Sequence, residues 1–148
     1  MATVEFSSQT GLIYPPEAVH AILSEPSLFP DWCPEKYNPE YNGGVSPGDF
    51  RFRITPLSIT GQVKSAQPVK KIHWEFGEGD FEGSIEWRLN SADSGTELSC
   101  VGTGVIHGVL NNIINTIFPY SSRFHRMFCD LFFGLKTELS RLKDVSRD

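Results

Sequence analysis

The apolar residues between Pro119 and Lys143 recur at spacings of three and four, which is the pattern of one apolar stripe along an α-helix. The stripe consists of Phe124, Phe128, Leu131, Phe132, Leu135, Leu139 and Leu142. At about 1.5 Å per residue this helix would be roughly 36 Å long, which is enough to cross a small domain. The stripe is rich in Phe at its start and contains only Leu at its end, so two interpretations stay open. A plain amphipathic core helix is the simpler one, and a helix that packs tightly at one end and roofs a cavity at the other is the alternative.

Three isoleucines at helical spacing precede this stretch, between Asn111 and Phe118. Proline suits the first turn of a helix, where a missing backbone N–H costs nothing. The long helix therefore begins near Pro119, or an earlier helix kinks there.

Much of the remaining chain alternates between apolar and polar residues, which is the pattern of half-buried β-strands. The alternation predicts strands over residues 3–12, 37–41, 50–54, 57–66, 72–76, 85–89 and 96–107. After the first strand, Tyr14-Pro15-Pro16-Glu17 opens a short helix that ends at Ser24-Glu25-Pro26. A second short helical segment follows as far as Asp31. Asparagine, glycine and proline at 42–49 predict turns.

Alternation alone does not decide which face of the strand at 96–107 points inward. One face holds Leu98, Cys100, Gly102, Gly104 and Ile106, and the other holds Ser99, Val101, Thr103, Val105 and His107. We favour the first face as inward, because its two glycines would leave space beneath the final helix. A single β-bulge would reverse this assignment.

The length and charge of the chain exclude several classes of protein. A chain of 148 residues is long enough for one domain with its own core, so we treat 1–148 as a single domain. The formal net charge of −5 argues against a nucleic-acid partner and against an anionic membrane surface, because both need a basic footprint. Aromatic residues make up 12% of the chain, with eleven Phe, which indicates a large apolar interior.

Targeting and redox features indicate a cytoplasmic protein. The N-terminal residues lack the basic and apolar regions of a signal peptide, and no apolar run is long enough for membrane insertion. The three cysteines, Cys33, Cys100 and Cys129, have no CxxC spacing. We therefore expect reduced thiols and no zinc site.

Four short segments carry a family resemblance that spans the chain. They are 23–34 (LSEPSLFPDWCP), 48–52 (GDFRF), 95–98 (GTEL) and 138–143 (ELSRLK). Together with the predicted order of elements, they resemble the START-like, Bet v 1-like (SRPBCC) superfamily, which includes polyketide cyclases, lipid-transfer domains and coenzyme-Q-binding proteins. The resemblance implies an α+β helix-grip fold, in which a curved antiparallel sheet of six to seven strands wraps around the C-terminal helix. It also implies an apolar ligand cavity between sheet and helix, but no shared catalytic motif.

No catalytic or metal-binding motif stands out in the sequence. The four histidines lack HxH or HExxH spacing, and the chain contains no nucleophile elbow and no phosphate-binding loop. Alternation places Glu75, Glu82 and Glu86 on the solvated outer face of the sheet. We therefore expect neither a metal nor a cofactor.

The predicted interior is mainly aromatic. The candidate ligand-binding residues are Trp32, Phe52, Trp74, Phe76, Trp87, Phe124 and Phe128. Large rings between one sheet and one helix are hard to pack without gaps, and apolar gaps bind apolar ligands. Core packing alone is the alternative.

Few polar groups are available for catalysis in such an interior. Tyr37 and Tyr41 would share one strand face, and a phenol on an apolar wall can orient or protonate a carbonyl. With His107, near the expected cavity mouth, they are the candidate catalytic residues. The alternative is that both tyrosines fill the sheet, with their hydroxyls at the rim.

Two functional hypotheses follow, and a small apolar molecule is the partner in both. In the first, which we favour, the protein is a cyclase-like enzyme of secondary metabolism that holds a polyketide or terpenoid-type substrate in a reactive conformation and excludes water. In the second, it is a non-catalytic carrier of a lipid, a quinone or another hydrophobic molecule. The scarcity of internal polar groups favours a carrier, or an enzyme that acts mainly through shape.

Overall fold

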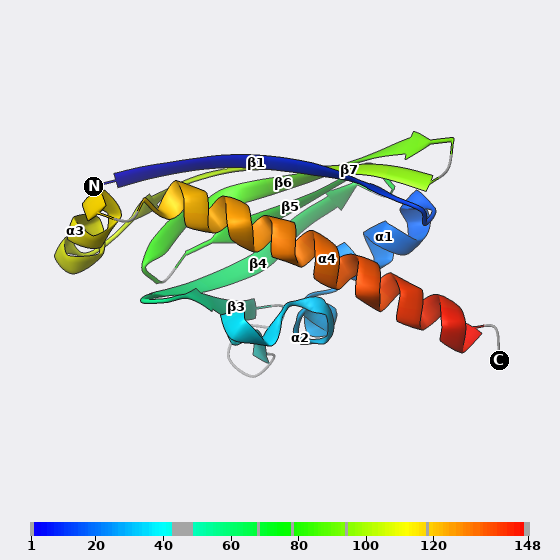
Figure 1. Cartoon of the computed structure of the whole chain (residues 1–148), viewed down its shortest axis with the longest axis horizontal. Coiled ribbons are helices and arrows are strands. Elements are labelled where there is room, and N and C mark those ends of the chain that lie inside the picture. The colour runs from blue at the N-terminus through cyan, green and yellow to red at the C-terminus, as the bar shows by residue number, and fades with distance from the viewer. Residues whose placement is uncertain are drawn as a thin grey trace.

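A curved antiparallel sheet and one long helix form the two main layers of the protein (Figure 1). In the computed structural model, which describes residues 2–42, 49–67, 69–77, 79–93, 95–117 and 119–146, the sheet has seven strands in the order β1-β7-β6-β5-β4-β3-β2. The strands are β1 (Ala2–Leu12), β2 (Glu40–Asn42), β3 (Asp49–Ile54), β4 (Leu57–Gln67), β5 (Lys71–Phe76), β6 (Phe81–Ala92) and β7 (Gly95–Ile106). All neighbouring strands in this order are antiparallel. The expected α+β helix-grip fold is confirmed.

Short helical elements connect β1 to β2, and two helices follow β7. They are α1 (Pro16–Leu23), the 3₁₀ turn η1 (Pro26–Leu28), α2 (Phe29–Trp32), the 3₁₀ turn η2 (Glu35–Tyr37), α3 (Val109–Ile117) and α4 (Tyr120–Ser146). The two short helices expected after the first strand are thus present, with proline in the first turn of each.

The strand predicted over 37–41 is wrong at its start. Tyr37 ends the turn η2, and the strand is confined to β2. The cause is local, because Asn38 adopts a left-handed conformation with φ 48°, which interrupts extended backbone. Tyr37 and Tyr41 therefore do not share a strand face. The turn predicted at 42–49 falls mostly on 43–48, outside the described residues.

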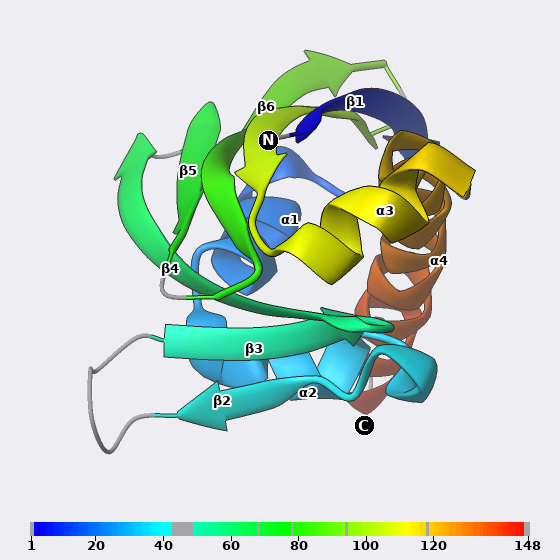
Figure 2. The ribbon, with the colours of Figure 1, turned by 90° about the vertical axis from the view of Figure 1, so that its left-hand side faces the viewer.

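The helix α4 closes the open side of the curled sheet (Figure 2). Its apolar stripe is buried from Phe124 to Leu139, and only Leu142, at the far end, is 40% exposed. The Phe-rich half packs on β1, where the Phe6 ring stacks on those of Phe124 and Phe128. The Phe-rich half of α4 is therefore closely packed against β1.

The inward face of β7 is the one that we favoured. Leu98, Cys100 and Ile106 are fully buried, whereas Val101 on the opposite face is 51% exposed. The space expected above the two glycines, however, is filled. A Cβ atom added at Gly102 would lie 2.3 Å from the Phe6 ring, and one added at Gly104 would lie 2.3 Å from the Phe81 ring. The glycines admit neighbouring aromatic rings and leave no cavity.

The isoleucines that precede Pro119 form the separate helix α3, which lies at the end of the molecule where β1 begins (Figure 1). The break before α4 agrees with the kink expected at Pro119. Asn115 Oδ1 accepts a hydrogen bond from the Tyr120 backbone N–H at 2.8 Å, which ties the two helices together. α3 leaves four large apolar side chains exposed, those of Val109, Leu110, Ile113 and Ile117.

Candidate functional site

The seven aromatic residues predicted to bind a ligand form one closely packed cluster. Trp32, Phe52, Trp74, Phe76, Trp87, Phe124 and Phe128 are all at most 3% exposed. Neighbouring rings are close, for example 5.1 Å between the centroids of Trp74 and Trp87 and 5.6 Å between those of Trp87 and Phe128. Such spacing is typical of a solid aromatic core. The structure therefore brings these residues together as packing partners.

The three indoles of this core differ in their hydrogen bonding. The Trp74 N–H donates to the Leu23 carbonyl at 3.3 Å. The N–H groups of Trp32 and Trp87 are buried and have no acceptor in the described part of the chain. A buried donor without a partner is unfavourable, so each of these two groups would gain from an added acceptor.

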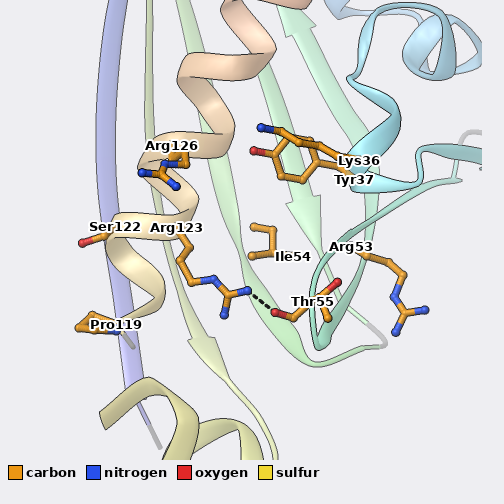
Figure 3. Close-up of a pocket in the computed structure, with 9 residues that line it drawn as sticks. All are labelled: Lys36, Tyr37, Arg53, Ile54, Thr55, Pro119, Ser122, Arg123 and Arg126. Atoms are coloured by element: carbon orange, nitrogen blue, oxygen red, sulfur yellow. Dashed lines mark hydrogen bonds between the residues drawn. The ribbon is translucent and has the colours of Figure 1, made fainter. Parts of the chain in front are cut away.

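An open pocket lies beside the aromatic core, between α4 and the end of β3 (Figure 3). Its volume is about 680 Å³. We call it the α4–β3 pocket, and it is lined by Lys36, Tyr37, Arg53, Ile54, Thr55, Pro119, Ser122, Arg123 and Arg126. None of the seven predicted aromatic residues belongs to it. Of the sequence-predicted site residues, only Tyr37 lines this pocket.

Tyr37 is fixed by a polar contact with α4. Its hydroxyl donates a hydrogen bond to Asp130 Oδ2 at 2.5 Å, and Lys36 Nζ lies 2.8 Å from the same oxygen. Burial, together with the hydrogen bond to Asp130, raises the pKa of Tyr37 well above its usual range. The phenol therefore stays protonated at neutral pH, with its proton directed at Asp130. In this arrangement Tyr37 is an anchor between η2 and α4 and is poorly suited to donate a proton to a ligand.

The pKa of Asp130 is lowered in the folded protein. Desolvation by burial acts in the opposite direction, but the hydrogen bonds from Lys36 and Tyr37 outweigh it. Ionised Asp130 therefore stabilises the fold at neutral pH, and this contribution is lost as the pH falls through the lowered pKa.

We expect Asp130→Asn to lower the free energy of unfolding by up to about 1 kcal/mol at pH 7, because the ion pair is partly solvated. The difference from the unmodified protein should shrink between about pH 5 and pH 3, where carboxylates become protonated. Thermal unfolding across this pH range measures it, with the exposed Asp93→Asn as control. A difference that stays constant over the whole range would contradict the role given to Asp130.

The other cations of the pocket are less heavily paired. Arg123 donates a hydrogen bond through Nη2 to the Thr55 carbonyl, and its guanidinium lies 4.9 Å from the centre of the Tyr120 ring. Arg126 makes no hydrogen bond or ion pair with another described residue, and Arg53 points away from the other lining side chains (Figure 3). The sequence signal for this group was the spacing of Arg123, Arg126 and Asp130 on one helix. Our sequence analysis missed it because charged residues beside an apolar stripe usually face water.

The three predicted catalytic residues do not converge. Tyr37 lines the α4–β3 pocket, whereas Tyr41 is 40% exposed on β2. His107 lies just after β7, where its Nε2 is 3.0 Å from Glu82 Oε2 in a solvent-exposed pair. Tyr41 therefore does not share an apolar lining with Tyr37, and His107 does not line the α4–β3 pocket.

A second polar cluster lies where α4 meets β1. His125 Nδ1 is 3.0 Å from Ser8 Oγ, and its Nε2 is 3.8 Å from the exposed Cys129 thiol.

Burial raises the pKa values of Cys33 and Cys100 to about 12, so both remain inert thiols at neutral pH. No group of three or more potential metal ligands occurs in the described part of the chain.

A second apolar hollow of about 520 Å³ lies under the C-terminal half of α4. Residues of α1 and of the segment before it line this hollow, with Leu139, Leu142 and Lys143 of α4. It brings together no cluster of polar groups. No helix within the described ranges has the length and apolar character needed to cross a membrane.

Solved structures with the same fold match nearly the whole chain. The Zhui aromatase/cyclase from a Streptomyces species is 15% identical, with a TM-score of 0.69 and 95% of each chain covered. A Chromobacterium violaceum protein is 16% identical, with a TM-score of 0.66 and coverage of 90% of this chain and 96% of that one. The Aha1 dimer from Colwellia psychrerythraea is also 16% identical, with a TM-score of 0.61 and coverage of 94% and 96%.

These identities are low, so the likeness concerns the fold. No protein-family model and no curated protein matches the sequence. The order of elements, the sheet and the gripped helix nevertheless agree with the resemblance noted in the sequence. The chain has the helix-grip fold, which these solved structures share.

Proposed function

We propose that this protein binds a small, largely apolar molecule in the α4–β3 pocket and acts as a carrier of it. The observation that carries the proposal is the pocket itself, whose volume of about 680 Å³ lies within the usual range of small-molecule sites. Ile54, Pro119 and the Tyr37 ring offer apolar surface there. The hydroxyl of Tyr37 is engaged by Asp130, so the pocket holds no obvious acid–base pair for catalysis.

Titration with the neutral fluorescent probe N-phenyl-1-naphthylamine tests this proposal. We expect saturable binding, and we expect Thr55→Trp, which fills the rim of the α4–β3 pocket, to weaken it by about tenfold, or about 1.4 kcal/mol. The matched control is Ala21→Trp, which places the same bulk in the apolar hollow under the C-terminal half of α4. An absence of saturable binding, or a loss caused by Ala21→Trp alone, would contradict the proposal.

A second candidate is the cyclase-like function, and one observation favours it. The unpartnered N–H groups of Trp32 and Trp87 would find acceptors in a carbonyl-rich chain admitted between α4 and the sheet. A fold relative of this chain is an aromatase/cyclase. Native mass spectrometry of freshly purified protein, followed by chromatography of any released molecule before and after incubation with the protein, separates the two functions. A carrier returns the molecule unchanged, whereas a cyclase converts it.

A further inference from the structure

We infer that the α4–β3 pocket selects molecules that carry an anionic, carboxylate-type head group on an apolar body. This inference rests on the proposed function and narrows its class of ligand. It comes from the charges that surround the pocket, which are unusual for this chain.

Positively charged side chains are concentrated at the pocket, although the protein as a whole has a negative net charge. The chain has 13 Lys and Arg against 18 Asp and Glu, yet four of the nine lining residues are cations and none is an acid. Arg53 points away, which leaves Lys36, Arg123 and Arg126 around the opening (Figure 3). An anion in this pocket would meet a locally positive field on an acidic protein.

Only one of these three cations forms a direct ion pair with a described carboxylate. Lys36 Nζ lies 2.8 Å from Asp130 Oδ2, whereas Arg126 is attracted by the same carboxylate without a direct contact. Arg123 is held by the uncharged Thr55 carbonyl and by the face of the Tyr120 ring, so its position is fixed while its charge remains. Arg126 has no hydrogen-bond or ion-pair partner among the described residues. A guanidinium carries five donors in a planar fork that matches a carboxylate, so both arginines retain donors for one.

The positions of the charged and apolar side chains also set the orientation of a bound ligand. Arg123 and Arg126 lie three residues apart on α4 and so neighbour each other on its surface, and Ile54 lies across the pocket from them (Figure 3). A head group at the two arginines would leave the apolar part of the molecule against Ile54 and the Tyr37 ring. Because Arg126 is exposed, water screens part of the attraction, and the gain from the charge should be moderate.

Decanoate and 1-decanol, which have the same chain length and differ in head group, test the inference by displacing N-phenyl-1-naphthylamine at pH 7. We expect decanoate to bind about tenfold more tightly than decanol, or about 1.4 kcal/mol. Arg126→Gln should reduce this ratio to about threefold or less, and Arg126→Lys should retain most of it. The control Arg51→Gln, at an exposed position of β3 outside the pocket, should leave the ratio unchanged.

The outcomes separate the inference from the proposed function. Equal affinity for the two molecules, or a ratio unaffected by Arg126→Gln and by Arg123→Gln, would overturn the anionic preference while leaving apolar binding intact. If the probe itself fails to bind saturably, both the proposed function and the inference fail. Raising the salt concentration should lower the ratio of decanoate affinity to decanol affinity, because salt screens exposed charges. A ratio that does not change with salt would also count against a role of charge.

Discussion

Phe128→Ala is expected to lower the free energy of unfolding by about 3–5 kcal/mol, the usual cost of removing a fully buried phenyl ring. Phe128 is 0% exposed, and its ring centroid lies 4.9 Å from that of Phe6 and 5.6 Å from that of Trp87. The neighbouring rings are held by the sheet and cannot fully collapse into the space left behind. For a chain of this size, each kcal/mol corresponds to about 2–4 °C in Tm, so thermal or denaturant unfolding measures the effect readily.

The matched control is Phe133→Ala on the same helix. Phe133 is 72% exposed, so its truncation should change stability by no more than about 0.5 kcal/mol. The Phe128→Ala protein should also bind a benzene-sized molecule in its new apolar cavity. A loss below about 1 kcal/mol would instead indicate loose packing beneath this part of α4, and the expected ligand cavity under the helix would become the better interpretation.

Most helices and strands were predictable because each carries its own periodicity, and the resemblance to a known superfamily implied their arrangement. The spacing of three and four along α4 and the alternation along the strands are local patterns, and the structure confirms both. The inward face of β7 was also predicted, although alternation alone left it open. The face with Leu98 and Cys100 carries the larger apolar side chains, and burial follows them.

The errors have one physical origin, which is that packing is decided between elements. The two glycines of β7 indicated space, but the space belongs to the Phe6 and Phe81 rings from the neighbouring strands β1 and β6. Tyr37 fitted a two-residue alternation, but the left-handed Asn38 places it in a turn, from which it reaches Asp130. Neither contact can be predicted from the local sequence, because each joins residues that are far apart in the chain.

The α4–β3 pocket was beyond prediction for a related reason. Lys36, Thr55 and Arg126 are far apart in the chain, and only the return of α4 past the end of β3 brings them together. The aromatic excess of the sequence forms a solid core, whereas the cations of the pocket, Lys36, Arg53, Arg123 and Arg126, were expected to face water. An apolar core beside a cationic opening suits an amphipathic ligand better than a wholly apolar one.

Gly134→Ala is expected to destabilise the protein, although alanine is the better helix former by about 1 kcal/mol. Gly134 lies inside α4, where a Cβ atom would be 2.0 Å from the Trp32 carbonyl oxygen. That oxygen belongs to the backbone at the end of α2 and cannot rotate away, so α4 and α2 would have to separate. Overpacking of this kind costs about 1–3 kcal/mol, and more when backbone must move.

Chemical denaturation of Gly134→Ala beside Ser140→Ala isolates the contact. Ser140 is exposed on the same helix, so alanine there should stabilise by up to about 0.7 kcal/mol through helix propensity alone. If Gly134→Ala lowers the free energy of unfolding and Ser140→Ala raises it, α4 contacts the Trp32 backbone at Gly134. This contact holds the aromatic core against the sheet. Two stabilising substitutions would mean that α4 lies farther from α2, and the closed core between Trp32 and α4 would then have room for a ligand.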